Sequence, residues 1–275
     1  MSIDELRLEN TTPDAAVRRG RRGRSRLGDV AAFLTLFAVV VVTWELIPRL
    51  GGVSEFVLPP PSLVVEAMTE DAGQYWTHGL VTAQEIGLGF VAGSVVGFLS
   101  AVAIFYSPFF RRAVYPLLLG FRIVPKVAFL PLFLIWFGIG LGSKIALATF
   151  AIFFLVLVQT MLGLASTEPE QIELGRSLRM SEFLLFLKIR LPSALPALMV
   201  GFKLAITYAL TNVIVAEMAV AAKGLGYVAV LAQSDLRTAS VIGVIIVVSV
   251  IGLILYGIGL LIERRVTFWY GNDDD

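Results

Sequence analysis

Glu173-Leu-Gly-Arg-Ser-Leu-Arg179 and, after nine further residues, Ile189-Arg-Leu191-Pro192 form a polar, helix-forming stretch in a chain that is otherwise mostly apolar. Hydrophobic residues make up 57% of the 275 residues, charged residues make up 16%, and the mean hydropathy is +0.84. Soluble domains carry about 25% charged residues. Apolar stretches of roughly 17 to 25 residues, long enough to cross a bilayer, recur along the chain. The sequence therefore predicts an all-α, polytopic membrane protein.

We expect six transmembrane helices, with the approximate bounds 29–47, 85–106, 113–138, 144–164, 196–220 and 239–262. The apolar stretch after the Arg-rich N-terminus lacks a small-residue cleavage site, which favours an uncleaved first span over a secretory signal. We divide the chain into a disordered, Arg-rich cytoplasmic tail (1–27), a six-helix transmembrane domain (28–270) and an acidic C-terminal tail (271–275).

Lys and Arg residues beside the spans predict the orientation, because cytoplasmic loops carry the excess of these residues. With the N-terminus inside, the cytoplasm holds the Arg-rich tail, the pair at 111–112, the loop at 165–195 and the pair at 264–265. The opposite side keeps only Arg49, Lys144, Lys223 and Arg237. Both termini are therefore expected in the cytoplasm.

The segment 48–84 is then expected outside. Its prolines end in Ser62, which we expect to cap a short helix over 63–68 at the membrane interface. Tyr75 and Trp76 are expected as anchors at the level of the lipid headgroups. Farther along, Gly138-Ile-Gly140-Leu-Gly142-Ser-Lys144 resembles a phosphate loop but lacks the Gly before the Lys, so we interpret it as a tight external turn.

Glycines recur at four-residue intervals in the second span, at Gly89, Gly93 and Gly97. On a helix they share one face and allow another backbone to approach closely. Packing within the subunit is the favoured interpretation, and packing between subunits is the alternative.

Three prolines interrupt the third span: Pro116, Pro125 and Pro131. A straight helix with all its hydrogen bonds is therefore excluded, and the freed carbonyls need protein or water as partners. Arg122 and Lys126 lie deep in the same span. Charges at that depth cost about 2.5–3.5 kcal/mol each on insertion scales, so we expect them to face a bundle interior or a water-filled path. The alternative is that Arg122 reaches the inner surface and Lys126 pairs with a carboxylate.

Enzymatic chemistry finds little support in the composition. The chain has no cysteine and one histidine, His78, which removes thiolate sites and most histidine catalysis. No Ser-His-Asp set, HExxH motif or metal-ligand cluster is present in the sequence. We expect no nucleic-acid partner. A self-contained secondary transporter or channel remains an alternative function, since it would also explain a broken span with buried charges.

The cytoplasmic loop at 165–195 is predicted to contain two short helices. Thr167 and Glu170 have the spacing of a capping box, which predicts a helix over 168–179. Ser181 is expected to cap a second helix, 182–190, that ends ahead of Leu191-Pro192. Two such helices suit a helix-in-groove contact with a soluble protein. An interfacial loop without a partner is the alternative.

This loop resembles the cytoplasmic loop of permease subunits of ATP-binding-cassette (ABC) importers, whose pattern is Glu-Ala-Ala, three residues, Gly, nine residues, Ile-x-Leu-Pro. Glu173, Ile189, Leu191 and Pro192 fit the pattern with its spacing. Leu174-Gly175 replaces Ala-Ala, and Arg179 stands where the family has Gly. If that turn needs a positive φ, Arg179 costs of the order of 1 kcal/mol there.

The resemblance extends over about residues 55–270. The stretches 122–132, 136–144 and 224–227 are similar to the nitrate/sulfonate/taurine branch, which includes permeases for pyrimidine precursors of thiamine. The resemblance implies a type I importer fold in a bacterial cytoplasmic (inner) membrane, a homodimer of permease subunits, two cytoplasmic ATPases and an external substrate-binding protein. It also implies that ATP and Mg²⁺ bind the ATPases, so that this chain binds no cofactor and hydrolyses nothing.

The resemblance assigns ATPase coupling to one set of residues: Ile172, Glu173, Leu174, Leu178, Arg179, Ile189, Leu191 and Pro192. For the translocation path we expect a second set: Arg122, Lys126, Lys203, Thr211, Asn212 and Glu217. Its cations would suit an anionic solute. In the alternative interpretation, Lys203 reaches the inner surface and Glu217 caps an external loop.

Overall fold

The computed structural model describes residues 26–121, 123–220 and 222–269, and every regular element in them is helical. The chain divides into two units, residues 1–62 and 63–275, which we describe separately. The predicted Arg-rich tail up to residue 25, the acidic tail and Arg122 lie outside the described residues.

The first unit consists mainly of α2 (Arg26–Gly51), which is long and apolar enough over Val30–Gly51 to cross a membrane. The next helix, α3 (Pro61–Glu70), begins one residue earlier than Ser62, so the prediction that Ser62 caps it is wrong. A proline is well suited to the first helical position. The exposed N–H of Ser62 donates instead to Oε2 of Glu45 on α2, at 3.0 Å.

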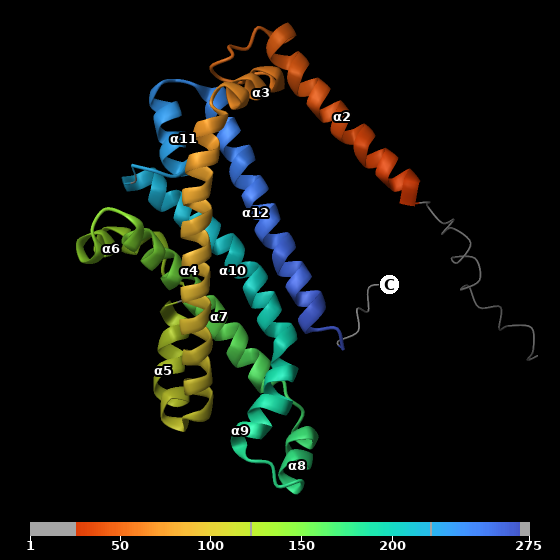
Figure 1. The fold of residues 1–275 in the computed structure, drawn as a ribbon, viewed down its shortest axis with the longest axis vertical. Coiled ribbons are helices and arrows are strands. Elements are labelled where there is room, and N and C mark those ends of the chain that lie inside the picture. The colour runs from red at the N-terminus through yellow and green to blue at the C-terminus, as the bar shows by residue number, and fades with distance from the viewer. Residues whose placement is uncertain (1–25, 122, 221, 270–275) are drawn as a thin grey trace, which may run out of the picture. The chain divides into compact units, whose positions relative to one another are not determined.

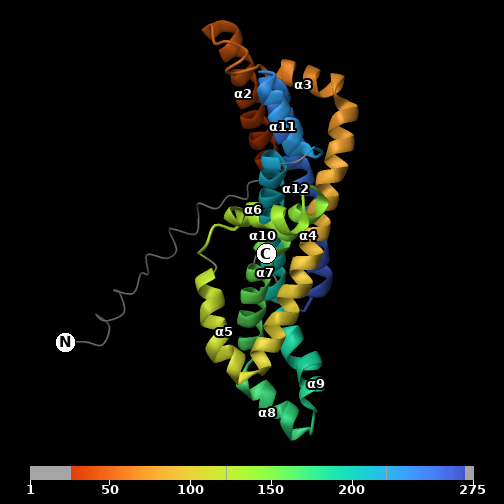
Figure 2. The same ribbon diagram turned by 90° about the vertical axis from the view of Figure 1, so that its left-hand side faces the viewer.

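The second unit holds all the remaining elements (Figures 1 and 2). In chain order they are α4 (Ala72–Tyr106), α5 (Pro108–Phe121), the 3₁₀ helix η3 (Lys126–Phe129), α6 (Leu130–Phe137), α7 (Leu141–Ala165), α8 (Pro169–Ser177), α9 (Glu182–Leu185), the π-helix η4 (Phe186–Arg190), α10 (Leu191–Val220), α11 (Leu225–Ser234) and α12 (Thr238–Val266). Both views place α8 and α9 at one end of this unit and α11 at the other.

Five helical segments in the described residues are long and apolar enough to cross a membrane, where the sequence led us to expect six. The missing one is the predicted third span. Its predicted break is confirmed near two of the three prolines, because α5 ends at Phe121, η3 begins after Pro125, and Pro131 lies in the first turn of α6. Pro116 lies inside α5 and does not end that helix. Proline at a helix start is tolerated, whereas in a helix interior it removes a hydrogen bond and clashes with the preceding turn.

The predicted second span is longer than expected, because α4 begins at Ala72 rather than near residue 85. This places Tyr75 inside the bundle, where it is buried and its hydroxyl donates to the carbonyl of Ser240 at 3.1 Å. The expectation that Tyr75 anchors at the headgroup level is therefore wrong. Trp76 is exposed, as such an anchor would be.

The centre of the second unit is the packing of α4, α7 and α10. Buried Ile86, Ile152 and Val213 come from these three helices and meet in one apolar cluster. A Cβ on Gly93 would lie 2.7 Å from the Cβ of Ile152, and one on Gly97 would lie 2.8 Å from the carbonyl oxygen of Phe153. The glycine face of α4 therefore packs on α7 within the subunit, which confirms the favoured interpretation.

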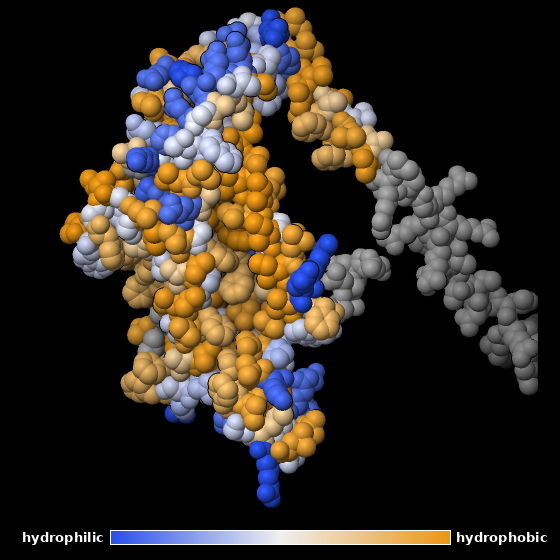
Figure 3. Space-filling view, viewed as in Figure 1, coloured by the Kyte–Doolittle hydropathy of each residue, from blue (hydrophilic) through white to orange (hydrophobic). Residues whose placement is uncertain are grey.

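Hydropathy also follows the long axis of this unit. On the face seen in Figure 3, hydrophobic side chains cover most of the body of the bundle, and hydrophilic ones gather mainly toward its two ends. A surface of this kind suits burial of the middle of the bundle in lipid.

Candidate functional site

The loop between α7 and α10 contains a helix end with a defined turn. At the end of α8, the N–H of Met180 donates to the carbonyl of Gly175 at 3.0 Å, and the N–H of Arg179 donates to that of Arg176 at 2.9 Å. This pair of bonds is a Schellman motif, whose hallmark is a left-handed residue just past the helix. Arg179 holds that position with φ 54°. The turn therefore does need a positive φ at the residue where the family pattern has Gly.

Gly175 allows the two parts of the loop to meet. A Cβ added at Gly175 would lie 2.8 Å from Cδ1 of Ile189 and 3.6 Å from Cδ1 of the buried Leu185. Both neighbours belong to the segment that follows the turn. The nearest atom is the flexible end of a side chain, so the Ala of the family pattern would fit at position 175 after a small shift of Ile189.

One predicted helix cap in the loop is confirmed and one is wrong. The Oγ of Ser181 accepts from the N–H of Leu184 at 3.3 Å, as expected for the cap of α9. Thr167 does not cap α8; it is buried one residue earlier, and the side chain of Glu168, which precedes the helix, makes no cap hydrogen bond to a backbone N–H. Pro169 at the first helical position removes one of the N–H groups that have no partner within the helix.

The second predicted helix of the loop does not end ahead of Leu191-Pro192. Glu182–Val220 forms one continuous helical segment of 39 residues, in which α9 passes through η4 into α10. In η4 the N–H of Leu191 donates to the carbonyl of Phe186, five residues back. This wider turn accommodates Pro192, which would clash with the carbonyl four residues before it in a regular α-helix.

Several coupling candidates lie on the exposed side of this loop. Leu174 and Leu178 are 61% and 65% exposed, and Phe183 on α9 is 71% exposed. Glu173 is also exposed on α8, whereas Ile172 is half-buried. Large apolar side chains that are exposed to solvent on a polar loop indicate a surface that contacts a partner. We call Leu174, Leu178 and Phe183 the loop surface.

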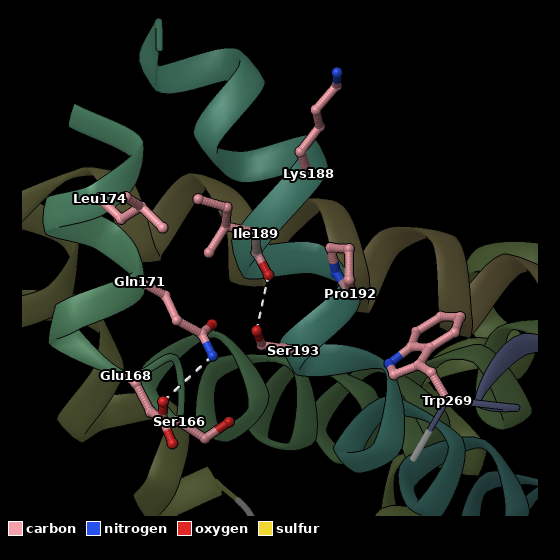
Figure 4. A pocket seen from close by; sticks show the side chains of 9 residues that line it. All are labelled: Ser166, Glu168, Gln171, Leu174, Lys188, Ile189, Pro192, Ser193 and Trp269. Carbon is pink, nitrogen blue, oxygen red and sulfur yellow. Dashed lines mark hydrogen bonds between the residues drawn. The ribbon is translucent and has the colours of Figure 1, made fainter. Parts of the chain in front are cut away.

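A groove of about 530 Å³ lies behind the loop surface (Figure 4). Leu174 lines one wall and Ile189 and Pro192 line the other, so the structure brings these three predicted residues together. Half-buried Leu191 lies between Ile189 and Pro192 in the chain.

Two further parts of the chain complete the groove. Gln171 donates to Glu168 at 3.3 Å on its floor. Trp269, from the segment after α12, closes the groove beside Pro192, a contribution that no motif in the sequence indicates.

The predicted path residues do not form one cluster. Lys126 donates to the carbonyls of Val124 and Phe121, at 2.8 and 3.1 Å, so it satisfies the backbone where the third span breaks.

The other described path candidates before Glu217 lie on α10 and have separate surroundings. Lys203 pairs with Glu263 on α12. Exposed Thr211 bonds back to the carbonyl of Thr207. Asn212 is buried, and its side-chain oxygen has no partner among the described residues.

Glu217 lies in a buried network at the end of the bundle away from α8. Its carboxylate accepts from the hydroxyl of Thr82 at 2.7 Å and from the N–H of Gly226 at 2.8 Å. The same hydroxyl accepts from the N–H of Leu225 at 2.9 Å. Glu217 therefore holds the turn before α11 against α4 and α10. This role resembles the alternative interpretation, in which Glu217 caps a loop.

A buried ion pair beside Glu217 was missed by the sequence analysis. Lys144 on α7 pairs with Glu85 on α4, and these residues are 5% and 1% exposed. The sequence places Lys144 in an external turn and Glu85 at the boundary of a span. No sequence signal pairs them, because the sequence does not show which two spans pack side by side.

The fold matches that of solved membrane subunits. One chain of the MetNI methionine ABC transporter, in an inward-facing conformation, is similar with a TM-score of 0.57 and 23% identity, over 78% of this chain and 100% of that one. A chain from an amino acid ABC transporter crystallised with histidines is similar with a TM-score of 0.55 and 20% identity, over 72% of this chain and 96% of that one. The fold is therefore that of an ABC transporter membrane subunit.

Sequence comparisons give the family. The taurine transport system permease protein TauC of Escherichia coli is 32% identical, over 85% of this chain and 88% of its own length. The putative aliphatic sulfonates transport permease protein SsuC of Bacillus subtilis is 31% identical over 95% of both chains. Residues 93–268 match the family described as binding-protein-dependent transport system inner membrane component, and the chain belongs to that family.

The protein is thus the permease subunit of an ABC importer and a multi-pass protein of the inner membrane. This finding confirms the family resemblance carried by the loop motif. It excludes the self-contained secondary transporter or channel that the broken span alone left open.

Proposed function

We propose that the loop surface docks onto a separate cytoplasmic ATPase subunit and that two copies of this chain work with two such ATPases. The observation that carries the proposal is the exposure of Leu174, Leu178 and Phe183 on a loop whose backbone is fixed by the Arg179 turn. Apolar side chains on a fixed helical frame suit a helix-in-groove contact. ATP and Mg²⁺ then bind to the ATPase, with the loop, both termini and Glu173 on the cytoplasmic side.

The proposed mechanism is alternating access. Closure of the ATPases on ATP moves the two docking loops, and each loop moves its transmembrane helices. An external binding protein delivers the solute to the opposite end of the pair. ATP and the loaded binding protein can each shift the equilibrium only by their differential affinity for the two states.

We infer a small organic solute as the cargo. The relatives named for taurine and for aliphatic sulfonates support a sulfonate-like anion. A relative of 29% identity, the formylaminopyrimidine transport permease protein ThiX of Halalkalibacterium halodurans, supports a small aromatic solute as the second candidate. Arg122, Lys203, Thr211, Asn212 and Glu217 remain our candidates for contact with the solute along the path.

Docking is tested with Leu178→Asp and Glu173→Lys in the importer reconstituted in nanodiscs. Both variants should insert and fold, yet lose co-purification with the ATPase and ATP hydrolysis stimulated by the loaded binding protein. Loss of one well-packed apolar contact, together with burial of an unpaired charge, weakens an interface by roughly 2 kcal/mol or more.

Leu236→Asp is the matched control, because Leu236 is also 65% exposed but lies beyond α11, at the other end of the bundle. It should retain the ATPase. Glu66→Lys on α3 is the corresponding control for Glu173. Undiminished ATPase binding by both loop variants would contradict the docking role.

A further inference from the structure

One cation of the docking loop contacts the helix bundle instead of solvent. Lys188 and Arg190 lie two residues apart in η4, yet Lys188 is exposed and Arg190 is half-buried. The guanidinium carbon of Arg190 lies 4.9 Å from the ring centre of Phe105 and 5.4 Å from that of Tyr106. A guanidinium within about 6 Å of an aromatic ring is attracted to the face of the ring. Arg190 therefore makes a specific contact with the end of α4.

The same turn of η4 supplies a second contact with α4. The ring of Phe186, the first residue of η4, meets the ring of Tyr106 edge-to-face, with 6.0 Å between their centres. Phe186 and Arg190 belong to one wide turn, in which the N–H of Leu191 donates to the carbonyl of Phe186. Such π-turns occur frequently at functional positions. We call Phe105, Tyr106, Phe186 and Arg190 the arginine clamp.

The arginine clamp lies at the corner between α4 and α5. Tyr106 is the last residue of α4, and α5 begins at Pro108. Both views place this corner at the same end of the unit as α8 and α9 (Figures 1 and 2). From the corner, α5 packs along α4 and ends at Phe121, where the third span breaks. The clamp therefore joins the docking loop to the part of the chain that leads into the break.

The charge of Arg190 gives this contact a preferred geometry. Phe105 and Phe186 also pack against an apolar cluster that includes Leu164 and Ala194. Apolar burial of that kind is non-directional, so the side chains involved can slide at little cost. A guanidinium is stabilised only while it stays within about 6 Å of the ring face. When the loop is displaced, η4 and the end of α4 should therefore move together.

We propose that Arg190 is a positioning residue of the importer, which makes the α4–α5 corner follow the docking loop when the ATPases close. Arg190 occupies the unspecified position of the Ile-x-Leu-Pro pattern, so the motif assigns it no role. The inference rests on the proposed function, because the movement passed on is that of a loop docked on an ATPase. It adds a second route to the one that runs through α10.

The test follows two labels in the complex of full-length permease and ATPase in nanodiscs. The chain contains no cysteine, so a fluorophore on one introduced cysteine, attached before the ATPase is added, marks a single position. Glu170→Cys places it on α8, and Ala103→Cys places it in the last turn of α4; both positions are exposed. The change in emission on addition of the non-hydrolysable analogue AMP-PNP with Mg²⁺ is measured. Both labels should respond in the parent protein.

Arg190→Gln keeps a planar polar side chain and removes the charge. It should leave co-purification with the ATPase and the response of the α8 label unchanged. The response of the α4 label should fall roughly fivefold, because a cation–π contact contributes about that factor. Arg190→Lys keeps a cation beside the rings and should restore part of the response. Tyr106→Leu should reproduce the loss, whereas Tyr106→Phe should respond as the parent does.

Arg112→Gln is the matched control, because Arg112 is an exposed cation on α5 at the same end of the bundle. It should change the response of neither label. A full response of the α4 label in a folded Arg190→Gln variant would overturn the inference. Loss of both responses in that variant would also overturn it, since Arg190 would then act on the loop alone. If thermal unfolding shows that Arg190→Gln does not fold, the two Tyr106 variants decide in the same way.

Failure of the docking proposal gives a different result. A parent protein that does not bind the ATPase, or whose α8 label does not respond to AMP-PNP, would contradict the proposed function and this inference with it. A parent protein that behaves as expected, with an α4 label that ignores the loss of the Arg190 charge, would retain the proposed function and lose only this inference.

Discussion

Lys203 and Glu263 join α10 to α12 through two contacts, with Nζ of Lys203 2.8 Å from Oε1 and 2.9 Å from Oε2 of Glu263. Both side chains are about one-fifth exposed. Each charge lies on a helix apolar enough to cross a membrane, where an unpaired charge is costly. The pair therefore gives Lys203 a structural role in addition to its proposed place in the path.

The pair predicts a rescue. Lys203→Met should lower the free energy of unfolding by roughly 1–3 kcal/mol, because it leaves Glu263 without a partner. Lys203→Met combined with Glu263→Gln should recover most of that loss in thermal unfolding of the purified protein. If the rescued double variant transports normally, Lys203 does not bind solute; if it folds but does not transport, the path role is supported.

Arg179→Gly should stabilise the docking loop. A left-handed residue with a Cβ costs about 1 kcal/mol more than glycine, and Arg179 has φ 54°. Proteolysis or hydrogen exchange of residues 169–190 measures the gain. Glu170→Gly, inside α8, is the control and should lower the protection of the loop. A loss of protection in Arg179→Gly would mean that its side chain contributes more than its backbone costs.

Gly93→Ala should destabilise the bundle by roughly 1–3 kcal/mol. The added Cβ would meet the Cβ of Ile152 at 2.7 Å and the carbonyl oxygen of Thr149 at 2.9 Å, and neither atom is the flexible end of a side chain. Gly87→Ala on the same helix is the matched control, because a Cβ there meets nothing within 4 Å. Thermal unfolding in detergent measures both. Equal melting temperatures would contradict the close packing of α4 on α7.

Thr82→Val should loosen the turn before α11. The substitution keeps the shape but removes the hydroxyl that joins Glu217 to the N–H of Leu225, which leaves two buried polar groups unpaired at about 1–3 kcal/mol each. Hydrogen exchange at residues 224–228 should rise. Thr82→Ser retains the hydroxyl and should keep the protection of the parent protein; a rise of the same size there would point to lost packing instead.

The apolar spans, the break after Phe121 and the Ser181 cap could be predicted, because each depends on local chemistry: hydropathy, proline geometry and a single hydroxyl. The coupling loop was found through its spacing. The predicted second span begins later than α4 because residues 72–84 mix polar and apolar side chains, yet Tyr75 in this stretch is buried against α12.

The interior charges could not be assigned from the sequence. The sequence gives the depth of a Lys or Glu along its own span but not which span packs beside it. The sequence alone therefore places Lys144 in an external turn and Glu85 at the boundary of a span, although both are buried and form an ion pair with each other. Lys203 shows the same limit, since its partner lies 60 residues away.

The unbroken passage from α9 through η4 into α10 has a mechanical consequence. One helical segment of 39 residues starts at the docking loop and reaches Glu217 at the far end, with no interruption by a non-helical linker. It contains the π-turn of η4, Pro192 and Pro196, which are the features at which helices bend. A displacement of the docking loop is therefore passed on through hydrogen-bonded backbone, and these positions set the direction in which α10 follows it.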